Sequence, residues 1–67
     1  MQKITREITK EQYHQLEQME PKQAYNFIEG IAWHSGYHPA GYGFYSPQFY
    51  IQGVKHIVSW LCGNSCD

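Results

Sequence analysis

Two pairs of residues in this chain have side chains and spacings that could bind a metal ion. His34 and His38 are separated by three residues, and so are Cys62 and Cys66. Two imidazoles and two thiolates can hold zinc in a tetrahedral site. However, a glycine and a proline interrupt the turn that would align the histidines, and the cysteine spacing is looser than usual. We therefore expect no metal and no cofactor, and keep a zinc-stabilised binding module as an alternative.

The same residues offer little for catalysis. A nucleophilic cysteine needs its thiolate held beside an imidazole in a fixed pocket. Cys66 is the penultimate residue of the sequence, a position at which chains commonly fray. The glutamates are interspersed with lysines and form no pair suited to acid–base chemistry. The sequence therefore predicts a protein that is not an enzyme.

The overall composition argues against several classes of function. The 67 residues include five basic and six acidic side chains, with a formal net charge of −1. Nucleic-acid binding needs a basic patch, so this balance argues against it. The longest apolar run is too short to cross a bilayer, and the N-terminal residues lack the apolar segment of a signal peptide. We expect a soluble cytoplasmic protein with no membrane partner and with reduced thiols.

The N-terminal third of the chain carries clear local signals. Residues 2–8 alternate in polarity and favour a short strand at the edge of a sheet. Thr9 and Gln12 have the spacing of a helix-capping box, in which each side chain bonds to the main chain of the other residue. This pattern predicts a helix over residues 10–19.

A second helix is expected over residues 21–33. Pro21 interrupts the first helix but fits the first turn of a new one. Apolar residues then recur at helical spacing at Ala24, Phe27, Ile28 and Ile31. Gly36 provides the C-terminal break.

The remaining pattern predicts a hairpin. Residues 44–52 and 54–62 favour two strands joined by a tight turn. Pro47 cannot donate a main-chain hydrogen bond, so the first of these strands is expected at a sheet edge or at a bulge. The element order is β-α-α-β-β. We expect one α+β domain over residues 1–67, with a small antiparallel sheet packed on two short helices.

The central part of the chain combines aromatic residues with an absence of charge. Residues 30–54 contain no charged side chain but hold seven of the eleven aromatic residues. A domain this small needs most of its rings for its core. We assign four of them there: Trp33, Phe44, Phe49 and Trp60. The tyrosines exceed that need, so we expect four of them to be exposed: Tyr37, Tyr42, Tyr45 and Tyr50.

An uncharged surface rich in rings is typical of the centre of a protein interface. We therefore expect a non-enzymatic protein-binding module. The predicted contact residues are His34, Tyr37, His38, Tyr42 and Tyr45. A pocket for a small ligand such as a nucleotide is the other alternative. A homodimer formed through an edge strand in residues 44–51 is compatible with each of these functions.

The C-terminal segment from Trp60 to Asp67 resembles the endings of very short phage and prophage proteins, of the form W-x4-S-C-D. The segment from Trp33 to Gly43 also resembles sequences of such proteins. The two segments cover less than a third of the chain. The resemblance implies a small accessory protein that inhibits or modulates a host or defence protein by binding it. It implies no particular binding residues.

Overall fold

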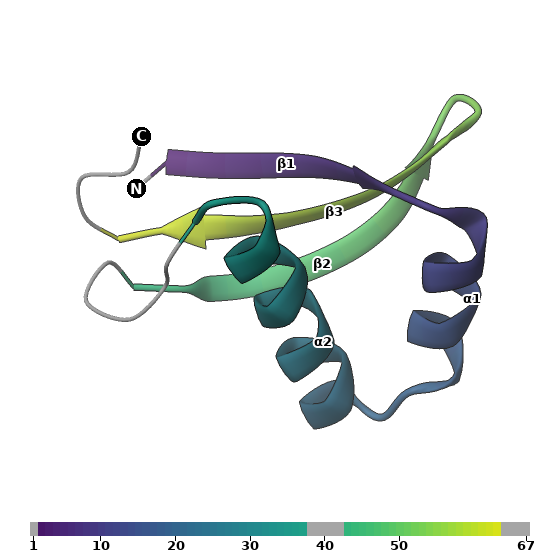
Figure 1. Cartoon of the computed structure of the whole chain (residues 1–67), viewed down its shortest axis with the longest axis horizontal. Helices are drawn as coiled ribbons and strands as arrows, with labels where there is room; N and C mark the ends of the chain where they lie inside the picture. The colour runs from purple at the N-terminus through teal and green to yellow at the C-terminus, as the bar shows by residue number, and fades with distance from the viewer. Residues whose placement is uncertain (1, 38–42, 64–67) are drawn as a thin grey trace.

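The computed structural model describes residues 2–37 and 43–63. Its elements follow in the order β1 (Gln2–Ile8), α1 (Lys10–Gln18), α2 (Pro21–His34), β2 (Tyr45–Gln52) and β3 (Lys55–Cys62), as Figure 1 shows. This order confirms the predicted α+β fold, with each boundary within one residue of the expected position. Neither helix in this part of the chain is long and apolar enough to cross a bilayer.

The three strands form one antiparallel sheet with β3 in the middle, in the order β1-β3-β2. Ile4 lies opposite Trp60, and Phe49 lies opposite Val58. Side chains directly opposite each other share a face of the sheet, so these four point to the same side. The strands β1 and β2 are the two edges, as predicted, and the register of β2 shifts at a bulge between Tyr45 and Gln48.

The start of α1 is fixed by the predicted capping box. The main-chain N–H of Gln12 donates to the Thr9 hydroxyl at 3.1 Å, and the N–H of Thr9 donates to the Gln12 side chain at 2.9 Å. Two donors that have no partner within the helix are thereby satisfied. One turn later, Leu16 buries its side chain in the core.

The end of α2 redirects the chain toward the core. The N–H of Tyr37 donates to the carbonyl of Ala32 at 3.0 Å, and the N–H of Gly36 donates to that of Trp33 at 3.2 Å. Gly36 has a φ of +95°, which a side chain would disfavour. This pair of bonds is a Schellman motif, in which the residue after the glycine commonly packs back onto the last turn of the helix.

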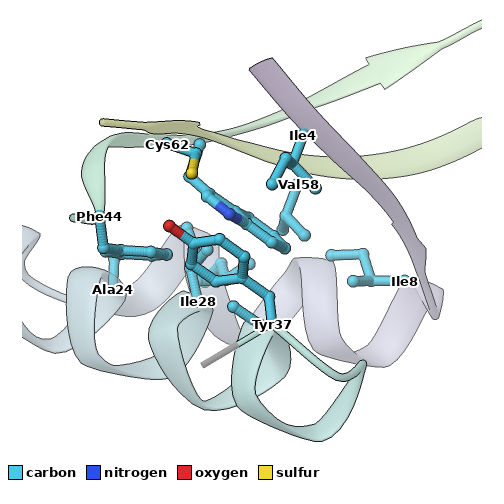
Figure 2. Close-up of a cluster of buried hydrophobic side chains, with 11 residues drawn as sticks. Ile4, Ile8, Ala24, Ile28, Tyr37, Phe44, Val58 and Cys62 are labelled. Carbon is cyan, nitrogen blue, oxygen red and sulfur yellow. The ribbon is translucent and has the colours of Figure 1, made fainter. Parts of the chain in front are cut away.

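Both helices pack against one face of the sheet, and the core lies between these two layers (Figures 1 and 2). From α2, Ala24 and Ile28 face inward, as their spacing predicted. Opposite them the central strand contributes Val58 and Trp60. Ile57 is also buried but lies outside this cluster, which agrees with its place on the other face of the sheet.

Two of the four rings assigned to the core, Phe44 and Trp60, are buried, and Phe49 is partly buried. Trp33 is not in the core, because 50% of its surface is exposed. Ala32 takes the inward position instead and is completely buried. It continues the Ala24–Ile28 row by one further helical turn, which turns the next residue, Trp33, away from the sheet.

Candidate functional site

Tyr37 was expected at the surface but is one of the buried residues, with only 6% of its surface exposed. Its ring lies 5.6 Å from that of Trp60 and 6.5 Å from that of Phe44, measured between ring centroids. Figure 2 shows it inside the cluster, with its hydroxyl directed toward the Phe44 side. The Schellman motif at the end of α2 brings it there. Tyr37 is therefore a core residue, and its ring is not part of the exposed surface.

Two tyrosine hydroxyls hold the chain segment that leads into β2. Tyr37 donates to the main-chain carbonyl of Gly43, and Tyr25 of α2 donates to that of Phe44 at 3.0 Å. The rings of Tyr25 and Phe44 also meet edge to face, 5.2 Å apart. Two consecutive carbonyls are thus tied to the helical layer. The next residue, Tyr45, follows a segment whose main chain is fixed at two points.

Tyr45 is the predicted contact residue whose position the structure defines best. Its side chain is 47% exposed, yet its ring is closely bordered by two glycines. A Cβ added at Gly43 would lie 2.7 Å from Cε2 of the ring, and one added at Gly63 would lie 2.6 Å from the same atom. Real Cβ atoms do not come this close to another atom, so the ring occupies space that only glycine leaves open.

The bulge in β2 begins directly after Tyr45. Ser46 has a φ of +50°, which is uncommon for a residue with a side chain. Pro47 follows, and regular pairing with β3 resumes at Gln48. Bulges of this kind change the direction in which a neighbouring side chain points. The bulge therefore directs the Tyr45 side chain, and the absence of side chains at Gly43 and Gly63 leaves room for its ring.

Burial and the neighbouring phenol of Tyr45 both raise the pKa of Tyr37, burial being the larger cause. A charged phenolate would lose its hydration in the core and would be repelled by a second phenolate nearby. Tyr37 therefore stays protonated and keeps its role as a donor to Gly43.

Of the other predicted contact residues, only some can be placed on the surface of the structure. His34 is the last residue of α2 and is exposed. His38 and Tyr42 lie outside the described residues. Of the five predicted contacts, the structure therefore leaves His34 and Tyr45 as exposed side chains and moves Tyr37 into the core.

Cys62 corrects the expectation of reduced thiols, because its sulfur is in a disulfide. In this state it offers no thiolate to zinc, which weakens the zinc alternative. Within residues 2–37 and 43–63, no three histidine, cysteine, aspartate or glutamate side chains are grouped to hold a metal ion. Disulfides persist mainly in oxidising compartments, so this bond gives no support to the expected cytoplasmic location.

An open groove of about 510 Å3 lies between the helices and β2. Its apolar walls include Met19, Ala24 and Ile28 on the helical side and Pro47 and Phe49 on β2. Glu17 is the one charged side chain among its described lining residues. Sequence analysis missed this groove because it depends on how far apart the two helices lie over the sheet. The one sequence feature that pointed toward an apolar groove was the absence of charged residues in the segment that forms β2.

No protein-family model, curated protein sequence or solved structure matches this chain. The arrangement around Tyr45 is therefore the basis for assigning a function.

Proposed function

We propose that this chain is a small non-enzymatic protein-binding module that contacts its partner through the exposed ring of Tyr45. The observation that carries the proposal is that an exposed aromatic side chain follows a main-chain segment that is anchored to the helical layer. Its ring is bordered by Gly43 and Gly63, and the preceding main chain is bonded to two tyrosine hydroxyls. Tyrosine is enriched among the residues that dominate binding energy in interfaces.

Anchoring the main chain before Tyr45 favours binding for an entropic reason. Ordering a mobile loop on association costs free energy, and a ring whose preceding main chain is already bonded to the helical layer avoids part of that cost. Tyr45 also has a hydroxyl, so it can fill an apolar pocket and still donate a hydrogen bond at its far end. The absence of charge over residues 30–54 supports a contact that becomes dehydrated at its centre.

The class of partner that we propose is a host or defence protein that this module inhibits or modulates. This part of the proposal is supported by the resemblance of the Trp60–Asp67 segment to very short phage and prophage proteins. His34, exposed at the end of α2, is a second candidate contact.

Comparative affinity capture tests this function. Immobilised wild-type protein, Tyr45→Ala and Val54→Ala are exposed to the same bacterial lysate, and bound proteins are quantified by mass spectrometry. Val54 is the matched control, because it is a 92% exposed apolar residue of the β2–β3 turn. We expect one partner to be captured by wild-type protein and Val54→Ala and lost with Tyr45→Ala. Equal capture by all three would contradict the proposal.

A further inference from the structure

The face of the sheet that points away from the helices holds a buried serine. Ser59 lies between Val58 and Trp60 of the central strand, which both face the helical layer, so its side chain points to the open face. Both helices lie on the other side of the sheet, yet Ser59 is only 2% exposed. Its hydroxyl makes no hydrogen bond within residues 2–37 and 43–63. Buried polar side chains almost always have a partner, so this hydroxyl calls for one.

The side chain of Lys3 reaches over Ser59. Lys3 pairs with Leu61 on one side of the central strand. Tyr50 pairs with Ile57 on the other side. The Lys3 ammonium nevertheless lies 5.5 Å from the centre of the Tyr50 ring, so this contact crosses β3 at the level of Ser59. Lys3 makes no ion pair in the described part of the chain, which leaves its charge available to a ligand.

An open pocket of about 210 Å3 lies on this face of the sheet. Its lining includes residues from all three strands: Lys3 of β1, Ser46 and Gln48 of β2, and Ser59 and Leu61 of β3. The side chains of these residues include one ammonium, two hydroxyls and one amide, all of which can donate hydrogen bonds. None of the described lining residues carries a carboxylate. One positive charge among several neutral donors favours an anionic ligand.

We propose that this pocket binds the phosphate group of a phosphate monoester. A terminal phosphate has three oxygen atoms that accept hydrogen bonds, which suits several donors better than the two oxygens of a carboxylate. The Lys3 ammonium has three donors on a flexible stem, and the hydroxyl of Ser59 gains the partner that it lacks within the chain. The pocket is smaller than the roughly 300–1,000 Å3 of sites that enclose a whole ligand, so the remainder of the monoester extends over the open face.

This site goes beyond the proposed contact at Tyr45, because Tyr45 is not one of the residues that line the pocket. Two sources present the same phosphate group: a free small molecule and a phosphorylated serine of another polypeptide. Glycerol phosphate represents the first source, and N-acetyl-phosphoserine amide represents the second. Acetate and N-acetylserine amide are the matched compounds that lack phosphate.

NMR titration of isotope-labelled protein with these four compounds at constant ionic strength tests the site. We expect both phosphate compounds to shift the main-chain amide signals of Ser46, Gln48 and Ser59, and the other two to leave them nearly unchanged. The phosphate compound that binds more tightly identifies the source. No shift at these amides with either phosphate compound, or an equal affinity for acetate, would overturn the proposal.

Two lysine variants separate a defined site from general attraction to positive charge. Lys3→Gln removes the charge at the pocket, and Lys55→Gln removes the same charge from the exposed start of β3, which does not line the pocket. We expect Lys3→Gln to weaken phosphate binding by about tenfold or more, as for the loss of one hydrogen bond to a charged group. Lys55→Gln should leave binding nearly unchanged, and equal losses in the two variants would contradict the assignment of Lys3.

Ser59→Ala separates a binding role of the hydroxyl from a structural one. Because this hydroxyl has no hydrogen-bond partner among the described residues, we expect urea denaturation to show no loss of stability. Phosphate binding should nevertheless weaken by about tenfold, since the donor to the phosphate is gone. Circular dichroism of each variant checks that the fold is intact. A phosphate affinity equal to that of the wild type would overturn the role of Ser59.

Discussion

The hydroxyl of Tyr37 donates a hydrogen bond to the main-chain carbonyl of Gly43, from inside the core to the segment that precedes β2. Gly43 in turn leaves room for the ring of Tyr45. Tyr37, which the sequence suggested as a partner contact, thus fixes the main chain that precedes Tyr45, a second residue predicted to contact the partner. The two tyrosines therefore differ in role: the hydroxyl of Tyr37 bonds to the main chain, and the ring of Tyr45 is exposed to solvent.

Replacing Tyr37 by phenylalanine tests this support. The ring and its packing on Trp60 remain, but the carbonyl of Gly43 loses its donor. We expect the free energy of unfolding to fall by about 0.5–1.5 kcal/mol, the usual net contribution of one hydrogen bond, because the Gly43 carbonyl is only partly buried. Urea denaturation measures it. Tyr13→Phe serves as the control, because the Tyr13 hydroxyl makes no hydrogen bond among the described residues, and its stability should be nearly unchanged.

Stability should also fall at alkaline pH because of Tyr37. Its pKa is raised in the folded state, so the folded protein holds this proton more tightly than the unfolded chain does. The contribution is complete below the unfolded tyrosine pKa of about 10. It is lost as the pH rises from there through the folded pKa. Denaturation curves at a series of alkaline pH values should therefore show a steeper loss of stability in the wild type than in Tyr37→Phe.

The glycine at position 63 offers a way to move the Tyr45 ring without removing it. A Cβ at Gly63 would meet Cε2 of Tyr45 at 2.6 Å, so we expect Gly63→Ala to displace the ring. The readout is a change in the NMR shifts of the Tyr45 ring protons. Gly30→Ala is the matched control, because nothing lies within 4 Å of an added Cβ there. It should leave the Tyr45 shifts unchanged.

The Gly30→Ala variant carries a prediction of its own. Gly30 lies in the interior of α2, where glycine lowers helix stability. With open space for the methyl group, we expect the substitution to raise the free energy of unfolding by about 0.5–1 kcal/mol. Thermal denaturation should show a higher midpoint, and an unchanged or lower one would show that α2 is constrained there in another way.

Removing the cap of α1 should lower the free energy of unfolding. In Thr9→Ala the N–H of Gln12 loses its acceptor, while the apolar packing of α1 through Leu16 stays intact. The expected loss is about 0.5–2 kcal/mol, as for other helix caps. Thr5→Ala, an exposed change of the same type within β1, is the control and should cost less. Equal losses would mean that the capping bonds contribute little.

Much of the fold could be predicted because its signals are local. The Thr9–Gln12 box and the Ala24–Ile28 row depend only on spacing along the chain, and both are confirmed. Trp33 was expected in the core and Tyr37 at the surface, and the structure has them the other way round. Local sequence signals for this reversal were also present. Ala32 continues the inward row of α2, and an apolar residue directly after the glycine that ends a helix commonly packs back onto it.

Other features could not be predicted from spacing. The close approach of Tyr45 to Gly63 joins the first residue of β2 to the chain just after β3, and it depends on how the bulge orients the ring. The groove depends in the same way on the separation of helices and sheet. The disulfide at Cys62 depends on redox conditions, which a count of two cysteines does not reveal.

The most direct test of the proposed function is the affinity of the captured partner, once purified, for wild-type protein and for Tyr45→Ala. Isothermal titration calorimetry measures both, with Val54→Ala as the control. A ring that dominates the contact should account for about 2 kcal/mol or more, so Tyr45→Ala should weaken binding by roughly 30-fold or more. An affinity for Tyr45→Ala within about twofold of the wild type would contradict the account, since that difference is under about 0.5 kcal/mol.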